Sequence, residues 1–279
     1  MRLGWDEIGE RFYETGVDRG VLYVMDKNAR YKKGVNWDGL TSVDESPDGA
    51  EQNDIYADNI KYLSLTSAEN FKATINAYQS PEEFDVCDGS ASLAKGVTVS
   101  QQSRRAFGFS YRSKIGNDVV GDDYGYIIHL VYNAKCSPSQ RTRSTTNDSP
   151  EAVELGWEVS TTPVTINAID PETGLPFKPT AHLQINSTAV DAAKLAALED
   201  LLYGKNGTPT YTAIESPEAG ADPSALGWYE RSGESGAYVY TLSTDTTVDN
   251  EKTYYEFSEV GGSDPTLPTP DEIYAMFNS

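Results

Sequence analysis

The stretch FGFSYRSKIGNDVVGDDYGYIIHLVYNAK, residues 107–135, decides the fold. In residues 107–111, aromatic side chains alternate with small ones, which is the two-residue period of a β-strand. Residues 126–132 follow the same period, with Tyr, Ile and Leu on one face and Ile, His and Val on the other. The link of residues 116–124 contains glycines and paired aspartates, which favour turns. The stretch therefore predicts one long antiparallel hairpin.

Other short runs with strand character lie on both sides of this hairpin. Residues 20–25 form a brief apolar run, and residues 71–79 and 153–159 alternate apolar with polar side chains. Leu183 and Ile185 alternate in a final run. Tyrosines, together with glycine and proline between the apolar runs, are typical of strands and turns. The predicted fold class is mainly β.

Two further segments have less regular patterns. Val35–Val43 contains spaced apolar positions and predicts a strand with an irregularity near Gly39. The segment DESPDGAEQNDIYADN, residues 44–59, is rich in turn formers and predicts a loop. A strand follows it over residues 60–65.

One helix is predicted over residues 189–203. Thr188 is the predicted N-cap, with Asp191 as the acid of its capping box, and Gly204 is placed to end the helix. Its leucines have helical spacing and are expected to cover one side of the β-structure: Leu195, Leu198 and Leu202. A second, short amphipathic helix is predicted to begin at Pro270 and to carry Ile273 and Phe277.

Charge separates the two halves of the chain. The formal net charge is −21; residues 1–150 hold 22 acids and 17 bases, and residues 151–279 hold 21 acids and 5 bases. Such an acidic surface repels phosphate, which argues against tight non-specific binding to nucleic acid. No apolar stretch has the length of a membrane span or the form of a signal peptide, so assembly in a cytoplasm is expected.

Motifs for catalysis, metals or cofactors are not found in the sequence. It contains no GxSxG, P-loop, GxGxxG or HExxH pattern. The only two histidines, His129 and His182, lie in predicted strands and are interpreted as ordinary strand residues. Cys87 and Cys136 lack zinc-site spacing and are expected to be thiols in a reducing compartment. The sequence predicts a protein that is not an enzyme and holds no metal or cofactor.

Carboxylates are the one abundant functional group. Those in the predicted loop do not follow the EF-hand register, and a solvated acidic loop explains them without a bound calcium ion. The loop acids are Asp44, Glu45, Asp48, Glu51 and Asp54.

One local group of bases lies near an acidic turn. Either the bases are ordinary surface charges, or basic strand ends meet acidic loops of a neighbouring subunit and set the register between them. The candidates for contacts between subunits or rings are Arg104, Arg105, Arg112, Lys114, Asp118, Asp122 and Asp123.

Several long strings have a wider resemblance. They include IGERFYETGVDRGVLYV, GVNWDGLTSVDESPDGAE, YADNIKYLSLTSAENFKATINAYQSPEEFDVCDGSA and LAALEDLLYG, and the hairpin region itself. In order and spacing they resemble the major tail tube proteins of siphophages, the long non-contractile-tailed bacteriophages, of Gram-positive hosts. The resemblance runs from about Ile8 to Gly204 and resumes at the closing LPTPDEIYAMF.

This resemblance implies a tail-tube-type β-sandwich or barrel subunit with one flanking α-helix. Six subunits form a ring, rings stack, and their inner strands join into a barrel around a lumen that passes double-stranded DNA without tight binding. Closure of this kind removes exposed sheet edges. The barrel candidates are the strands around residues 35–43, 56–65, 104–113 and 124–133. The lumen-lining candidates are Asp38, Asp44, Glu51, Asp54 and Asp58.

The resemblance also implies partners and a location. Rings stack on a tail tip initiator, with tape measure and tail terminator proteins as further partners. The product is a virion tail assembled in the host bacterial cytoplasm, with no membrane involved.

The predicted domains are a tube domain over residues 1–207, an insertion over 208–265 and a returning segment over 266–279. The insertion is rich in Tyr, resembles a β module of related tail proteins and is expected on the outside of the tube. Within it, GAYVYTLS and KTYYEFS predict a hairpin pair.

Three other functions stay open. The first is a virion surface protein that binds a receptor or carbohydrate, which the aromatic insertion favours. The second is a hydrolase that uses two carboxylates, since such a pair needs no local motif. The third is the tube of a contractile tail or secretion system.

Overall fold

The computed structural model describes residues 4–138, 145, 152–215, 217–218, 220–235 and 237–278. The chain divides into two compact units. The first consists of Met1–Tyr203 and Asp264–Ser279, and the second is Gly204–Ser263. Each unit is described by itself. The described part of the chain is mainly β, with several sheets and few helices.

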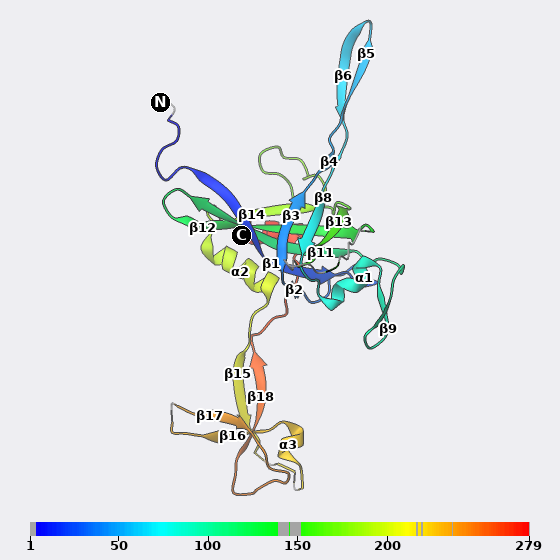
Figure 1. Cartoon of the computed structure of the whole chain (residues 1–279). Coiled ribbons are helices and arrows are strands. Elements are labelled where there is room, and N and C mark those ends of the chain that lie inside the picture. Colours follow the sequence, from blue (N-terminus) through cyan, green and yellow to red (C-terminus); the bar gives the residue numbers. More distant parts are fainter. Residues whose placement is uncertain are drawn as a thin grey trace. The chain divides into compact units, whose positions relative to one another are not determined.

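The first unit is built on an eight-stranded sheet (Figure 1). Its strand order is β2-β1-β11-β12-β13-β8-β3, and β14 also pairs with β12. All of these pairings are antiparallel. The strands are β1 (Phe12–Val24), β2 (Val35–Trp37), β3 (Leu40–Glu45), β8 (Lys72–Ala77), β11 (Phe107–Asn117), β12 (Gly121–Cys136), β13 (Leu155–Thr161) and β14 (His182–Asn186).

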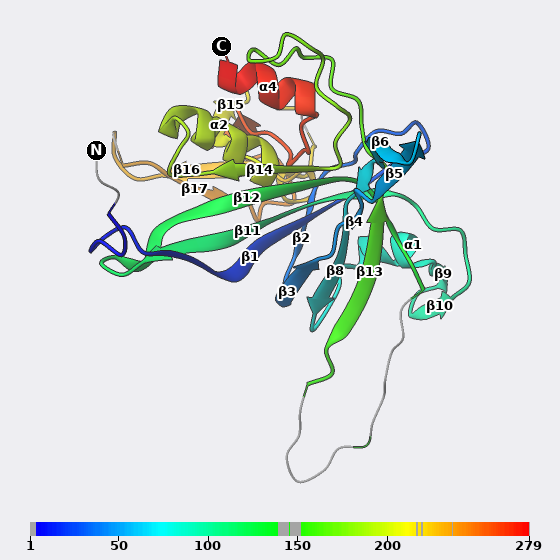
Figure 2. The ribbon, with the colours of Figure 1, turned by 90° about the horizontal axis from the view of Figure 1, so that it is seen from above.

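The sheet divides into two layers at β12. Residues 127–131 of β12 pair with β14, whereas residues 134–136 pair with β13. Figure 2 shows β3, β8 and β13 diverging from the layer of β1, β11 and β12. Because two strands leave the same edge of β12 in succession, side chains of β8 and β13 pack against those of β11 in one core cluster.

Aromatic residues fill the core between the two sheet layers. Trp157 is fully buried, and its ring centroid lies 5.4 Å from those of Trp37 and Phe84. Phe107 and Phe109 enter the same cluster from β11, at the alternate positions that the sequence predicts. On β8, Ala73, Ile75 and Ala77 are buried, which confirms the predicted inner face. Cys87 and Cys136 are buried thiols in this cluster.

A second core lies between the sheet and two helices, α2 (Ala192–Tyr203) and α4 (Pro270–Asn278). Figure 2 shows both helices on one face of the layer that contains β12 and β14. Leu195, Leu198 and Leu202 of α2 pack with Ile128, Leu130 and Tyr132 of β12 and Ile273 of α4. The predicted leucine face is therefore confirmed.

The helix ends differ from the prediction at one point. The N-cap of α2 is Asp191, whose Oδ1 accepts hydrogen bonds from the backbone N–H of Ala193 and Lys194 at 3.0 and 3.1 Å. Thr188, the predicted N-cap, instead donates to Asn186 Oδ1. An ionised aspartate is the better acceptor at a helix N-terminus, where backbone N–H groups are unpaired. Gly204 follows the helix with φ +78°, as predicted.

α4 begins at Pro270, as predicted, and has a reciprocal capping box. Thr269 N–H donates to Glu272 Oε2 at 2.7 Å, and Glu272 N–H donates to Thr269 Oγ1 at 3.3 Å. Proline at the first helical position needs no acceptor for a backbone N–H.

The predicted long hairpin is confirmed, but its connection is shorter than predicted. β11 and β12 pair as far as Asn117 opposite Gly121, so only residues 118–120 form the turn. The Asn117 side chain closes it by accepting from Val119 N–H and Val120 N–H. Residues 121–124 belong to the strand because this side-chain cap makes a wider loop unnecessary.

The turn-rich segment after β3 is not a loop, which corrects the prediction. It contains β4 (Asp48–Gly49), which pairs with β7 (Glu69–Asn70), and β5 (Gln52–Ala57), which pairs with β6 (Ile60–Thr66). Asp58 and Asn59 form the turn with φ of 50° and 61°, the left-handed values that a tight hairpin turn requires. We call residues 52–66 the arm.

The arm pairs with no strand of the eight-stranded sheet. Figure 1 shows it leaving that sheet between β3 and β8. The candidate barrel strand at residues 56–65 therefore turns back on itself at Asp58 and Asn59, instead of forming one straight strand. Smaller elements complete the unit: η1 (Glu82–Phe84), α1 (Asp85–Asp88) and the hairpin of β9 (Ala91–Ala94) and β10 (Val97–Val99).

The second unit is a small sheet with the order β15-β18-β16-β17 and one short helix. β17 pairs with β16, not with β18, so the predicted hairpin of GAYVYTLS and KTYYEFS is wrong. β18 pairs on one side with β15, an interaction between strands distant in sequence. The elements are β15 (Thr208–Ala213), α3 (Pro223–Leu226), β16 (Tyr229–Ser232), β17 (Val239–Leu242) and β18 (Tyr254–Val260).

Candidate functional site

The five candidate lumen acids lie in two groups. Asp38 follows β2, and Asp44 lies on β3, where its Oδ2 accepts from Asn76 Nδ2 at 2.7 Å. Glu51, Asp54 and Asp58 lie in or next to the arm. Four of the five are exposed; Asp54 is half-buried because Ser64 donates to it at 2.6 Å and Lys61 lies 2.7 Å away. These two contacts lower the pKa of Asp54.

The candidate interface acids at the β11–β12 turn contact the N-terminal segment of the same chain. Gly9 N–H donates to Asp118 Oδ1 at 3.0 Å, and Tyr13 OH donates to Asp122 Oδ1 at 2.8 Å. The hydrogen bond to Asp122 raises the pKa of Tyr13. Asp123, the third acid of this group, is exposed. The acidic turn thus holds the chain that leads into β1.

The candidate bases separate along the chain. Arg104 and Arg105 precede β11 and are half-buried, whereas Lys114 lies on β11, nine or more positions further along the chain. Arg112 does not fit the predicted surface interface, because its side chain is only 12% exposed and is paired within the chain. Its Nε and Nη2 donate to the two carboxylate oxygens of Asp18 at 2.8 and 2.9 Å.

Arg112 is part of a charge network on the α2 face of β11. Its guanidinium lies 4.4 Å from the ring centre of Tyr126, and Tyr126 OH donates to Glu199 of α2 at 2.9 Å. Arg19 lies 4.0 Å from the same Glu199 carboxylate. The hydrogen bonds from Arg112 lower the pKa of Asp18. The network stabilises the contact between α2 and the sheet.

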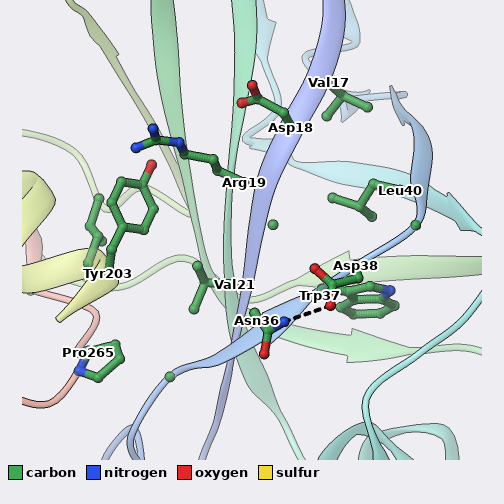
Figure 3. Close-up of a pocket in the computed structure, with 14 residues that line it drawn as sticks. Val17, Asp18, Arg19, Val21, Asn36, Trp37, Asp38, Leu40, Tyr203 and Pro265 are labelled. Atoms are coloured by element: carbon green, nitrogen blue, oxygen red, sulfur yellow. Dashed lines mark hydrogen bonds between the residues drawn. The ribbon is translucent and has the colours of Figure 1, made fainter.

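An open groove of about 460 Å³ lies beside this network (Figure 3). Asp18 and Arg19 line it from β1, Tyr203 from the end of α2, Asp38 from the β2–β3 connection and Leu40 from the start of β3. β1 changes register here, and Arg19 has a φ of +50°, which marks a bulge. The candidate lumen acid Asp38 is therefore a groove residue as well, where it accepts from Asn36 Nδ2 at 2.7 Å.

A compact polar cluster lies between the two sheet layers. His129 of β12 and His182 of β14 approach to 3.2 Å between Nδ1 and Nε2. Glu45 of β3 places Oε1 3.4 Å from His129 Nδ1 and 4.0 Å from His182 Nε2. Tyr111 OH donates to the same oxygen at 2.6 Å. Burial lowers the pKa of His129 to about 4, so the ring is neutral at neutral pH.

From the sequence, His129 and His182 are each interpreted as an ordinary strand residue, and no contact between them is predicted. Their proximity follows from the register of β12 with β14, in which Val131 lies opposite His182 and His129 opposite Gln184. Forty-five residues lie between the end of β12 and the start of β14, so periodicity carries no information on that register. The one feature of the sequence that could have indicated this cluster is that each histidine lies beside apolar residues in a predicted strand.

The second unit presents a group of aromatic rings. Tyr211 and Tyr240 stack with a centroid distance of 3.8 Å, although β18 and β16 lie between their strands, so the sheet is strongly coiled. Tyr229 contacts Tyr211 at 5.3 Å and Phe257 at 5.9 Å. Arg231 lies 4.2 Å from the ring centre of Tyr238.

No protein-family model matches this chain, and comparison with curated proteins finds no match. Among the described residues, no helix is both long enough and apolar enough to span a bilayer.

Proposed function

We propose that the chain is a structural subunit of a long, non-contractile phage tail, assembled in the host bacterial cytoplasm. In this proposal six copies form a ring, rings stack on a tail tip initiator, and the tube conducts DNA during ejection. The resemblance of residues 8–204 to siphophage tail tube proteins supports it. A mainly β unit with helices on one face is compatible with that resemblance.

The arm is the observation that carries the proposal. It is a two-stranded ribbon that exposes a row of large apolar side chains, and an isolated ribbon of this kind is at best marginally stable in water. Apolar surface in such a projection is typical of a contact with another protein. The side chains, each at least 37% exposed, are Ile55, Tyr56, Ile60, Tyr62, Leu63 and Leu65.

A second copy of the chain is the partner that the tube proposal requires. Each subunit of a closed ring gives one face and receives another, so an arm can contact the neighbour at every position. The N-terminal segment supplies a further candidate contact, because Trp5 and Ile8 are 76% and 83% exposed. Tape measure and tail terminator proteins are the other proposed partners.

The acidic charge fits a conduit that does not hold its cargo. Carboxylates that line a lumen repel DNA phosphates and so reduce adhesion during passage. The candidates for this lining remain Asp38, Asp44, Glu51, Asp54 and Asp58.

Electron microscopy of the purified chain tests the proposal. We expect rings or hollow tubes after concentration or after addition of tail tip complexes. Virion tails that lack this chain would contradict the proposal.

The aromatic group of the second unit favours one alternative, a virion protein that binds a receptor or carbohydrate. Tyrosine rings can stack on sugar rings, and Tyr238 and Phe257 are 41% and 42% exposed. Glycan-array binding by the isolated chain, combined with no assembly into tubes, would favour this alternative over the conduit.

A further inference from the structure

Glu45, His129 and His182 come from three strands in two sheet layers and bring three potential ligand atoms close together. These atoms all lie within 4.8 Å of one another. We propose that the three residues form a binding site for a first-row divalent transition-metal ion, with Zn²⁺ as its principal ligand. The proposal does not depend on ring assembly or on the tube.

The separations of the ligand atoms suit a tetrahedral ion. Bonds of about 2.0–2.1 Å from zinc to nitrogen or oxygen place neighbouring ligand atoms about 3.3 Å apart at the corners of a tetrahedron. The separations here are 3.2 Å between the two imidazole nitrogens, and 3.4 and 4.0 Å from them to Glu45 Oε1. Binding requires both imidazoles to turn so that their lone pairs meet at the ion, and Glu45 Oε1 to approach His182 Nε2.

A direct contact between ring nitrogens holds the two rings close together. They lie within 9° of parallel, with centroids 5.4 Å apart. That is close to the largest centroid distance compatible with a 3.2 Å contact between ring nitrogens, so the two nitrogens point at one another and share a hydrogen bond. An ion replaces this hydrogen bond when both rings turn their lone pairs toward it.

Neighbouring side chains suit the ligands. Ser113 Oγ lies 2.9 Å from His129 Nε2, so an Nε2–H that donates to Ser113 leaves Nδ1 free of a proton and able to bind metal. Tyr111 donates to the Glu45 carboxylate and fixes its orientation. Two imidazoles and one carboxylate favour Zn²⁺ and similar ions over Mg²⁺ and Ca²⁺, which prefer oxygen ligands alone.

An ion can reach the site from solvent. A cavity of about 360 Å³ is lined by Glu45, Tyr111, Ser113 and His129, and the Glu45 side chain is 32% exposed. Water from this cavity can supply the fourth ligand. A bound ion would join β3 of one layer to β12 and β14 of the other and stabilise their packing, since binding to the folded state alone adds to its stability.

The first test uses the full chain without a histidine tag, freed of metal with a chelator that is then removed. We expect calorimetry with Zn²⁺ to show one ion bound per chain, and Mg²⁺ to show none. Because the chain has only two histidines, ¹⁵N-histidine NMR reports both ligands directly. Zn²⁺ should shift His129 Nδ1 and His182 Nε2 together, and unchanged ring nitrogens would overturn the proposal.

Variants identify the ligands. Glu45→Gln and His182→Gln should each weaken Zn²⁺ binding by at least about 10-fold, and Tyr111→Phe by about 10-fold through the carboxylate it orients. Asp44→Asn, one residue from Glu45 on β3, is the matched control and should bind as the wild type does. Equal affinity in Glu45→Gln and the wild type would assign the ion to another site. If a variant does not fold, the NMR of the wild type decides.

Discussion

Arg112 lies between Tyr111 and Ser113 on β11. From the sequence, it is predicted to be a surface charge or a contact with a neighbouring subunit. The structure instead encloses its guanidinium between Asp18, Tyr126 and α2. We predict that Arg112→Met lowers the free energy of unfolding by about 1–3 kcal/mol, because it leaves the Asp18 and Glu199 carboxylates without their shared cation. Urea unfolding measures this change. Arg11→Met is the control and should change it by less than about 0.5 kcal/mol, since Arg11 is exposed and its ion pair with Asp118 is long, at 4.0 Å.

The same pair predicts a pH dependence. Arg112 lowers the pKa of Asp18 in the folded state below the value of about 3.9 expected in the unfolded chain. The ionised pair therefore contributes its full stabilisation above pH ~4, and the contribution is lost as pH falls through the folded pKa. Asp18→Asn should show a smaller loss of stability than the wild type between about pH 4 and pH 2. Parallel stability curves for the two proteins in that range would contradict the assignment.

Residue patterns predict burial better than they predict partners. Alternation along β11 places Phe107 and Phe109 on one face, and both are buried. It cannot reveal that Glu45 meets His129, because 84 residues separate them and the contact depends on how β13 and β14 leave the edge of β12.

At the scale of the element, the N-terminus of α2 is capped by one side chain, that of Asp191. Asp191→Ala should destabilise the protein by about 1 kcal/mol, because two backbone N–H groups lose their acceptor. Thr188→Ala is the matched control and should cost less, since the Thr188 side chain bonds to Asn186 and not to the helix. Thermal unfolding of the two variants compares them. A larger loss in Thr188→Ala would restore the N-cap that the sequence predicted.

Elements with a strong local pattern were predictable, and those that depend on distant pairing were not. β8, the β11–β12 hairpin, α2 and α4 have clear periodicity or capping residues and agree with the sequence. In the arm, the strand predicted over residues 60–65 agrees with β6, but β5 was missed because Asp and Asn in residues 52–59 disfavour strands. Pairing with β6 compensates for the low strand propensity of β5. β17 was assigned the wrong partner because a strand's neighbour is not encoded in the strand itself.

The arm predicts a separation between folding and assembly. Tyr56 and Tyr62 are 68% and 67% exposed, so replacing both with Ser removes little buried apolar surface from the isolated chain. We expect the double variant to unfold within about 2 °C of the wild type and to form no tubes under conditions where the wild type does. Leu93→Ser, at an equally exposed apolar position on β9, is the control and should leave tube growth unchanged. Normal tubes from the double variant would exclude the arm as the contact.

At the scale of the whole molecule, the boundaries of the second unit predict that it can be removed. Lys205 and Ser263 exchange two backbone hydrogen bonds of 3.0 Å, so the chain enters and leaves this unit at adjacent positions. Thr266 N–H donates to Leu201 O, which keeps the returning segment on the first unit. Replacing residues 206–262 with a short glycine turn should therefore leave a folded first unit with α4 in place. Circular dichroism and calorimetry test this, and an unfolded product would show that the first unit needs the second.

The distribution of charge predicts which acids matter to DNA. If the candidate lining residues face a lumen, six copies per ring place thirty carboxylates around the passing duplex, five from each subunit. Neutralising Asp38, Asp44, Glu51, Asp54 and Asp58 to their amides should leave tubes intact and slow DNA ejection from triggered virions, because phosphate repulsion is reduced. Raising the salt concentration should reduce the difference from the wild type, since screening weakens the same repulsion. The matched control removes the same number of charges from the second unit, at Glu215, Glu218, Glu234, Glu256 and Glu259. An equal slowing in both variants would show that total charge, and not a lining, governs passage.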